Sequence, residues 1–90
     1  MPTLRLPDGL RRYTGGEASI EVPGATVAEA LAAAFAAHPD LRLRLVDDAG
    51  RVHPYLAVFL NEAELGRDSL GEAVLAPGDT LTFLEAIGGG

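Results

Sequence analysis

Few side chains in this sequence could carry out chemistry. The chain has 90 residues with two histidines and no cysteine, and all seven of its basic residues are arginines. Without cysteine there is no disulfide, no thiolate nucleophile and no cysteine ligand for zinc or an iron–sulfur cluster. His38 and His53 are distant from each other in the sequence, so we expect no metal site.

The remaining polar groups do not match a catalytic pattern. Asp47 and Asp48 are adjacent in a glycine-containing turn, where carboxylates are usually solvated. Ser19 and Ser69 have no histidine partner nearby and no nucleophile-elbow motif. The Gly15–Gly16 pair lacks the strand–loop–helix context of a phosphate-binding loop. We therefore expect that the protein is not itself an enzyme.

The composition narrows the class of protein. Thirteen acidic residues against seven basic ones give a net charge of −6, which favours solubility and argues against binding to nucleic acid or anionic membranes. The length predicts one small domain. No apolar run approaches the roughly 18 residues of a membrane span, and the N-terminus lacks the pattern of a signal peptide. We expect a cytoplasmic protein.

The first half of the sequence predicts two strands and a helix. Residues 3–7 and 18–22 alternate between apolar and polar types, and the loop between them predicts a hairpin. Thr26 and Glu29 form a capping box, in which the Thr26 hydroxyl accepts from the Glu29 amide and the Glu29 carboxylate accepts from the Thr26 amide. Pro39 ends the helix. The expected apolar stripe on this helix consists of Val27, Leu31, Ala34, Phe35 and His38.

The second half predicts a further set of strands. Residues 41–45 have leucine at every second position and could form either a short strand or a turn of helix. Residues 55–60 are a near-continuous apolar run, which is typical of a strand covered on much of both faces. A tight turn leads to a short strand at residues 63–65. The last strand, residues 80–84, follows a turn at residues 76–79.

This order of elements predicts an α+β fold of the ubiquitin-like β-grasp type. We expect a mixed sheet of four to five strands with one main helix packed on one face, because each element must bury its apolar side. The first and last strands should lie side by side at the centre and run parallel. The domain should span residues 1–87, with residues 88–90 as a flexible C-terminal glycine tail.

Alternation along the last strands predicts which side chains face solvent. If Val58 and Phe83 face the helix, then Phe59 and Leu84 face outward, close to the tail. An exposed apolar patch with an aromatic residue marks an interaction site, and an acidic surround would complement a basic partner cleft. We assign partner binding to Phe59, Leu84 and Ile87. A shift of one residue in register would exchange the two faces.

Four segments carry a family resemblance over nearly the whole chain. They are Thr26-Val27-Ala28-Glu29-Ala30-Leu31 running to His38-Pro39-Asp40-Leu41, Phe59-Leu60-Asn61-Glu62, Pro77-Gly78-Asp79, and the final strand leading to Gly89-Gly90. Together they resemble the small ubiquitin-like sulfur-carrier proteins of the ThiS/MoaD type. Residues 10–16 and 50–55 look most like the carrier of mycobacterial-type cysteine biosynthesis, and archaeal-type molybdopterin carriers have similar loops. Gly88 stands where the family often has alanine or serine.

The resemblance implies a reactive C-terminus. An E1-like enzyme would adenylate the Gly90 carboxylate with ATP and magnesium, and sulfide or a persulfide would then displace AMP to leave a thiocarboxylate. Gly88, Gly89 and Gly90 would form the tail that enters the partner. Glycine suits this role because it has no Cβ, so that it leaves the carbonyl unhindered and adopts backbone angles closed to other residues. The carrier itself would bind no cofactor.

The resemblance also implies a set of partners. Besides the E1-like enzyme, there would be a sulfur-accepting enzyme, either a pyridoxal-phosphate-dependent cysteine synthase or the large subunit of molybdopterin synthase. In the cysteine pathway a metalloprotease would release cysteine from the tail. Thiamine synthesis and tRNA thiolation are further acceptors that the sequence leaves open.

Three interpretations of the tail stay open at this point. The chain could be a sulfur carrier, a ubiquitin-like modifier conjugated to target lysines through the same diglycine, or a binding module whose tail is a frayed end. With no lysine and no cysteine, the chain has no side-chain amine or thiol to attack its own activated end. A GC-rich genome would produce the same bias in composition.

Overall fold

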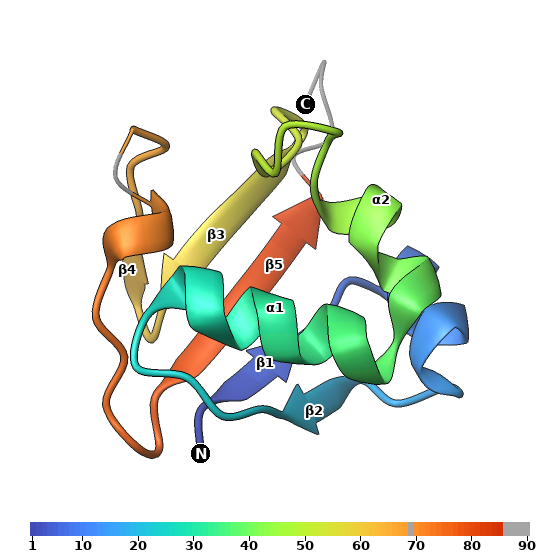
Figure 1. Ribbon diagram of the computed structural model, residues 1–90, viewed down its shortest axis with the longest axis horizontal. Helices are drawn as coiled ribbons and strands as arrows, with labels where there is room; N and C mark the ends of the chain where they lie inside the picture. Colours follow the sequence, from blue (N-terminus) through green and yellow to red (C-terminus); the bar gives the residue numbers. More distant parts are fainter. Residues whose placement is uncertain (69, 86–90) are drawn as a thin grey trace.

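A mixed sheet and one long helix build the domain. The computed structural model describes residues 1–68 and 70–85, and within them a five-stranded sheet has the order β2-β1-β5-β3-β4. Helix α1 (Val27–Ala37) covers one face of this sheet (Figure 1). The strands are β1 (Thr3–Arg5), β2 (Ser19–Glu21), β3 (Leu56–Leu60), β4 (Ala63–Glu64) and β5 (Thr80–Glu85).

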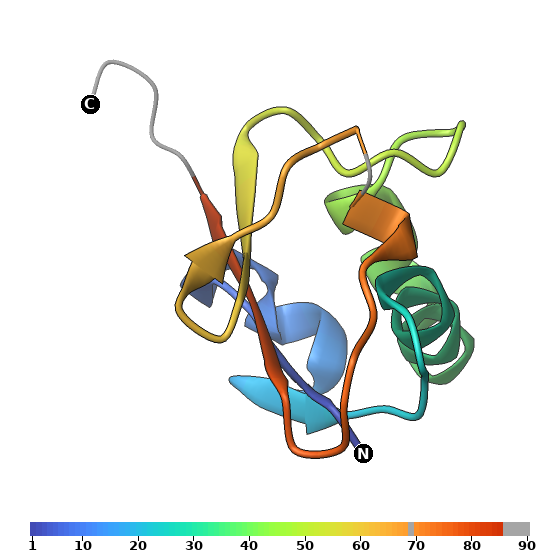
Figure 2. The ribbon, with the colours of Figure 1, turned by 90° about the vertical axis from the view of Figure 1, so that its left-hand side faces the viewer.

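The strand pairing is that of a β-grasp. β1 and β5 run parallel at the centre of the sheet, while β1 pairs with β2, β3 with β5 and β3 with β4 in antiparallel fashion. The predicted hairpin and the predicted parallel central pair are therefore confirmed. Seen from the side, the sheet and α1 form two layers (Figure 2). No helix in residues 1–68 and 70–85 has the length and apolar character needed to cross a membrane.

The capping box at the start of α1 forms as predicted, except that one of its two hydrogen bonds has a different donor. Thr26 Oγ1 accepts a hydrogen bond from the Glu29 amide at 3.2 Å, as predicted. The Glu29 carboxylate accepts from the Ala25 amide at 2.9 Å, so the predicted bond to the Thr26 amide is wrong by one residue. The cause is tertiary: the Leu75 amide donates to the Ala25 carbonyl at 2.9 Å and holds the segment before the helix in a strand-like pairing.

The chain stays helical after α1. A 3-10 turn, η2 (Pro39–Leu41), continues directly into the one-turn helix α2 (Arg42–Leu45). Leu41 and Leu45 are buried whereas Leu43 is 57% exposed. Residues four apart share a helix face, while a strand would have put all three leucines on one side. The structure thus decides the open alternative for residues 41–45 in favour of helix.

The segment after β1, expected as an open loop, is a 3-10 helix, η1 (Asp8–Thr14). It packs inward through buried Leu10 and Thr14. The Thr14 hydroxyl lies 3.0 Å from the Arg11 carbonyl and 2.8 Å from the Glu17 carbonyl, so a buried polar group is satisfied locally. Short 3-10 segments lack the long apolar period that identifies an α-helix, which is why the sequence pattern did not indicate this one.

The core lies between α1 and the inner face of the sheet. Leu4, Leu81 and Phe83 are fully buried on the two central strands. The predicted helix stripe is confirmed for Val27, Leu31 and Ala34, which are buried, and for Phe35, which packs partly against the core. His38, its predicted last member, is instead the C-cap residue beyond the end of α1, because Pro39 follows it. Further buried side chains are Leu6, Leu10, Val22, Ala30, Leu41, Leu45, Val46, Leu56, Val58, Leu70 and Leu75.

Candidate functional site

Strand β5, the last described element of the chain, lies in the middle of the sheet. It lies between β1 and β3, and its last residue, Glu85, pairs with Leu56 at the start of β3. Thr3 at the start of β1 pairs with Thr80 at the start of β5, so the N-terminus lies at the opposite end of the sheet (Figure 2). We call the end of the sheet formed by Leu84, Glu85 and Leu56 the tail edge.

The predicted reactive residues follow the tail edge in the sequence. Gly88, Gly89 and Gly90, the predicted tail, and Ile87, a predicted partner-binding residue, lie outside the described residues. The predicted boundary between domain and tail lies outside them as well.

An apolar patch covers the outer face of the sheet beside the tail edge. We define this outer patch as Ala57, Phe59 and Leu84 on the outer face, together with exposed Tyr55 in the turn before β3. Leu84 is 48% exposed and pairs with Ala57, while half-buried Phe59 pairs with Thr82. Val58 and Phe83 are buried against the helix layer. The predicted faces of β3 and β5 are therefore confirmed, and the role of Phe59 and Leu84 in partner binding stays a prediction.

Tyr55, which no sequence pattern indicated as a binding residue, extends the outer patch. Its ring is 48% exposed and stacks on the His53 imidazole, with 5.0 Å between ring centroids and 10° between planes. His53 Nε2 is in turn 2.8 Å from the Leu43 carbonyl oxygen, which ties the stack to α2. Tyr55 lies in the turn before β3, so the period-two alternation of the strand does not place its side chain. The stack with His53 could not be found that way.

Arg67 holds the loop that carries this aromatic pair. Its guanidinium donates to the carbonyls of Val52 and Pro54 at 3.0 Å each and also to the carbonyl of Leu56. The planar fork of arginine allows one side chain to satisfy several acceptors at fixed geometry. The loop from Val52 to Leu56 is thereby fixed relative to the segment that follows β4, and Tyr55 with it.

The charges around the outer patch are mixed. Arg5 of β1 pairs with Thr82, and Thr82 pairs with Phe59 on the same outward row. Glu64 of β4 pairs with Phe59 from the other side. The expected acidic surround therefore includes an arginine on this face, because the β1–β5 pairing, which joins distant segments, brings Arg5 into the row.

The described carboxylates with shifted pKa values have structural partners. The pKa of Asp47 is lowered, chiefly because its carboxylate accepts the Arg51 amide and also the Ala49 amide, each at 2.9 Å. The pKa of Asp79 is lowered by the Ala76 amide at 2.8 Å and then by the Asn61 side chain at 3.2 Å. These bonds stabilise turns, and neither carboxylate belongs to the outer patch.

Other polar residues considered from the sequence do not gather into a site. His38 is the C-cap residue of α1, Asp48 is exposed in its turn, and Ser19 pairs with Arg5 on β2. Ser69 lies outside the described residues. Among residues 1–68 and 70–85 no three histidine, cysteine, aspartate or glutamate side chains are grouped so that they could hold a metal ion.

A groove of about 600 Å³ opens on the helix side of the molecule. Ala28 and Leu31 of α1, Arg51 and Arg67 line it, together with η3 (Leu70–Glu72). The Arg67 guanidinium is already engaged by backbone carbonyls. Because α1 forms one wall, the groove lies on the opposite face of the sheet from the outer patch.

The described site presents groups for binding. Beside the tail edge it offers an exposed aromatic ring and an apolar strand surface, which are typical of contact surfaces between proteins. The central strand β5 ends at Glu85, beside that surface. Such an arrangement can present a chain end to another protein, and the chemistry would then take place in the partner.

Comparisons with known proteins agree with this architecture. The ThiS family model matches residues 4–90. The sulfur carrier protein CysO of Mycobacterium tuberculosis is 28% identical over 90 residues, with 98% of this chain and 97% of that protein covered. CysO in the crystal structure of the BexX/CysO complex from Amycolatopsis orientalis matches with a TM-score of 0.88 and 37% identity, and each chain is covered in full. SAMP1 from Haloferax volcanii matches with a TM-score of 0.75 and 31% identity over 99% of this chain and 98% of its own.

The fold and the site define a ubiquitin-like β-grasp protein that presents a central C-terminal strand beside an apolar outer face. The match over residues 4–90 identifies the family: the chain belongs to the ThiS family.

Proposed function

We propose that this protein is a sulfur carrier whose Gly90 carboxylate is converted to a thiocarboxylate. The observation that carries the proposal is the ThiS family match, which extends through Gly90. Relatives of similar length that align over nearly their whole chains are named sulfur carrier proteins. The β5 strand supports the proposal because it ends at Glu85 on the tail edge, and residues 86–90 follow it in the sequence.

The proposed chemistry is acyl activation followed by substitution. The Gly90 carboxylate attacks the α-phosphorus of ATP in an E1-like partner, magnesium-bound pyrophosphate leaves, and an acyl-adenylate forms. Sulfide then attacks the acyl carbon and AMP leaves. The lack of a Cβ in glycine keeps that carbon open to the nucleophile. The chain contributes the reactive end, and the partner supplies ATP and magnesium binding.

The outer patch is the proposed contact for these partners. Tyr55, Phe59 and Leu84 combine an exposed aromatic ring with apolar strand residues, and aromatic side chains often dominate binding energy at interfaces. Ile87 would extend this contact along the tail. The solved complex of a CysO relative with BexX is consistent with a carrier that works through a bound protein.

Cysteine biosynthesis is the favoured destination of the sulfur. The relatives that carry the name CysO support this choice over molybdopterin synthesis. The acceptor would then be a pyridoxal-phosphate-dependent cysteine synthase, and a metalloprotease would release cysteine from the tail. If molybdopterin is the destination instead, the acceptor would be the large subunit of molybdopterin synthase.

Intact mass spectrometry tests the proposal directly. The purified chain is incubated with its E1-like enzyme, magnesium-ATP and sulfide, and an ATP-free reaction serves as the control. We expect a mass gain equal to the exchange of one oxygen for sulfur, located at Gly90 by fragmentation. A variant lacking Gly90 should keep its circular dichroism spectrum and gain no sulfur. An unchanged mass with an enzyme that is active on another carrier would reject the proposal.

Protein modification is the second candidate. One observation favours it, the similarity of the chain to SAMP1 from Haloferax volcanii. A second similar structure from the same organism is called small archaeal modifier protein 1. In this case the same acyl-adenylate would be attacked by a lysine amine of a target and form an isopeptide bond. Conjugates detected in a host lysate with an antibody would support modification. Their absence under activating conditions would leave sulfur transfer as the function.

A further inference from the structure

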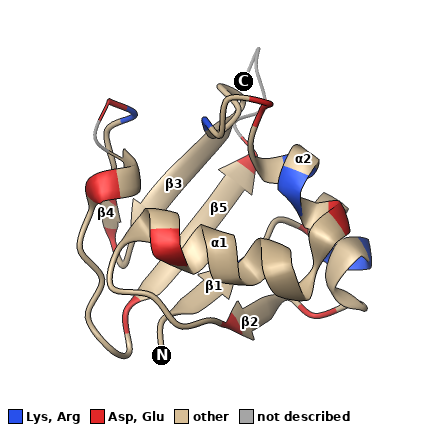
Figure 3. Ribbon diagram, in the orientation of Figure 1, with Lys and Arg blue, Asp and Glu red and all other residues tan. Residues whose placement is uncertain are grey.

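One corner of this acidic protein carries an excess of positive charge. The 3-10 segment η1 and residues 39–45 together contain Arg11, Arg12, Arg42 and Arg44 against Asp8 and Asp40, a net charge of +2. Since the whole chain has a net charge of −6, the rest of it carries −8. The two segments pack against each other, and their basic residues gather on one flank of the molecule (Figure 3).

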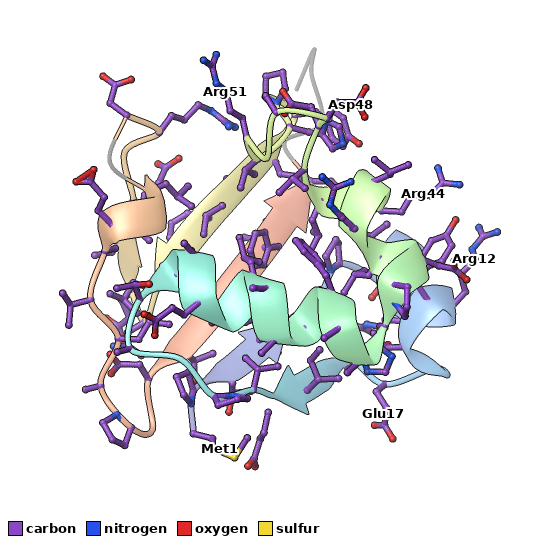
Figure 4. The ribbon with its side chains drawn as sticks, in the orientation of Figure 1. Met1, Arg12, Glu17, Arg44, Asp48 and Arg51 are labelled. Carbon is purple, nitrogen blue, oxygen red and sulfur yellow. The ribbon has the colours of Figure 1, made fainter. Side chains whose placement is uncertain are left out.

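Two of these arginines meet at one tyrosine. The guanidinium carbon of Arg44 lies 5.1 Å from the Tyr13 ring centroid, and that of Arg12 lies 5.7 Å from it. Both side chains reach out from the same flank, one from α2 and one from η1 (Figure 4). Cation–π attraction to the half-buried ring orients both guanidinium groups and offsets part of their mutual repulsion.

These cations have little local compensation. Within the described residues Arg11 forms an ion pair with Asp8 at 2.8 Å, whereas Arg12 and Arg44 form none. Two guanidinium groups at one tyrosine ring, neither paired with a carboxylate among the described residues, favour anionic partners. Arginine is also well suited to carboxylates, because its planar fork can donate two parallel hydrogen bonds.

An open groove with apolar walls adjoins the two cations. It has a volume of about 440 Å³ and is lined by Tyr13, Pro39, Asp40, Leu43 and Arg44. Leu43 is 57% exposed, although its neighbours Leu41 and Leu45 are fully buried. Arginine, tyrosine and an exposed leucine around a groove are the composition of a protein contact. We name the surface formed by Arg12, Tyr13, Leu43 and Arg44 the basic corner.

We propose that the basic corner binds an acidic segment of a partner protein in which carboxylates alternate with apolar side chains. The carboxylates would bind the guanidinium groups of Arg12 and Arg44, and an apolar side chain would enter the groove beside Leu43. The residues of this surface belong to η1 and α2, whereas Ala57, Phe59 and Leu84 of the outer patch belong to β3 and β5, and the two surfaces approach each other where His53 joins Tyr55 to the Leu43 carbonyl.

Charge argues for a short protein segment and against a nucleic acid. A nucleic acid presents a long uniform line of phosphates and would extend past the corner to the rest of the molecule, whose net charge is −8. A short peptide covers the corner alone, and charges beyond about 8 Å are screened at physiological salt. The apolar groove and Asp40, which also lines it, suit a mixed peptide better than a bare polyanion.

The test is an NMR titration of the full-length ¹⁵N-labelled protein with a synthetic peptide of alternating glutamate and leucine. A peptide with glutamine in place of glutamate is the control. We expect the glutamate peptide to shift the amide signals of Tyr13, Leu43 and Arg44, and added salt to weaken binding. The double variant Arg12→Ala/Arg44→Ala should bind at least about tenfold more weakly, a change of about 1.4 kcal/mol.

Matched variants separate local contact from overall charge. The double variant Arg5→Ala/Arg51→Ala removes the same charge and should change affinity less than about twofold, because neither residue lines the groove or lies over the Tyr13 ring. Leu43→Glu alters an exposed side chain, so it should fold normally while it places a repelling carboxylate in the groove. It should abolish the shifts.

Several results would overturn the proposal. The glutamine peptide could bind as tightly as the glutamate peptide, or ATP or a short RNA could bind equally or more tightly at the same residues. Concentrating the protein alone could also shift the signals of the basic corner, which would identify a second copy of the chain as the occupant. An absence of shifts with the glutamate peptide would also overturn it. Because the readout is binding and not sulfur transfer, these outcomes leave the proposed function unaffected.

Discussion

Gly24 illustrates how one residue can depend on contacts that its neighbours in sequence do not reveal. It stands between β2 and α1 with φ of +155°, and a Cβ built on it would lie 2.6 Å from the Ala30 amide nitrogen. That nitrogen belongs to the backbone of α1 and cannot move aside without disturbing the helix. Asp47 is a second example, since its carboxylate accepts two backbone amides of its own turn.

Replacement of Gly24 by alanine should destabilise the fold. We expect Gly24→Ala to lower the free energy of unfolding by about 1–3 kcal/mol, because the methyl group overlaps helix backbone and the dihedral is unfavourable for a side chain. Urea unfolding followed by circular dichroism measures the change. Gly66→Ala is the matched control: its Cβ would meet nothing within 4 Å, so stability should stay the same or rise slightly. Equal effects of both substitutions would contradict this account.

Asp47 should contribute acid-dependent stability. Its pKa is lowered in the folded protein, chiefly by the Arg51 amide, so the folded state binds a proton less readily than the unfolded state does. This contribution is fully present above the unfolded pKa of about 3.9 and is lost as pH falls through the folded value. Asp47→Asn should therefore flatten the loss of stability below about pH 4.

Thermal unfolding as a function of pH measures this effect. Asp48→Asn is a suitable control, because the neighbouring Asp48 is exposed and its side chain makes no hydrogen bond within the described part of the chain. If both substitutions reduced the loss of stability at low pH equally, the total charge of the protein, and not the hydrogen bonds of the turn, would produce the pH dependence of stability.

At the scale of elements, the loop before β3 depends on a clamp from another part of the chain. Arg67, after β4, donates to backbone carbonyls of Val52, Pro54 and Leu56. The stack of Tyr55 on His53 adds a second restraint. Together they hold the aromatic ring of Tyr55 at the tail edge. The segment after β4, which carries Arg67, therefore positions a residue of the proposed partner contact.

Replacement of Arg67 by lysine should loosen this loop. Lysine keeps the charge but has no planar fork, so we expect Arg67→Lys to lower the free energy of unfolding by about 1 kcal/mol, a small value because the side chain is exposed. Hydrogen exchange at residues 52–56 should become faster. Arg51→Lys is the control, since Arg51 lies in the same groove without side-chain hydrogen bonds among the described residues. Unchanged exchange in Arg67→Lys would exclude the clamp.

At the scale of the whole molecule, the parallel pairing of β1 and β5 separates the two ends of the chain. Thr3 and Thr80 lie at one end of the sheet, whereas Glu85 marks the tail edge at the other (Figure 1). The outer patch accompanies the tail edge, while the basic corner occupies a flank. The fold thus builds three surfaces from different elements: the N-terminal end, the proposed contact for the activating partner, and the proposed peptide site.

This separation predicts opposite effects of extensions at the two ends. A short N-terminal tag should leave sulfur loading unchanged, because it lies at the far end of the sheet from Glu85. The same tag placed after Gly90 should abolish loading, since it removes the free glycine carboxylate. Intact mass after incubation with the E1-like enzyme, magnesium-ATP and sulfide measures both. Sulfur located on a C-terminally extended chain would contradict the proposed chemistry.

Local interactions explain what the sequence by itself determined. The N-cap bond from the Glu29 amide to Thr26 spans three residues, and the alternation that buries Val58 and Phe83 spans two. Such patterns depend on short-range geometry, so they can be recognised without the fold. The order of strands and helix then left few ways to bury every apolar face, and the β-grasp with its parallel central pair followed.

Only the tertiary structure decided the features that join distant segments. Three such features depend on contacts between residues far apart in the sequence. His53, which stacks on Tyr55, bonds to Leu43, and Arg67 bonds to the loop before β3. Arg44 of α2 meets Arg12 at the Tyr13 ring of η1. Residues 41–45 became helical because Leu41 and Leu45 both reach the core, which no local pattern could show. Contacts of this kind arise from packing, and packing is settled by the whole chain at once.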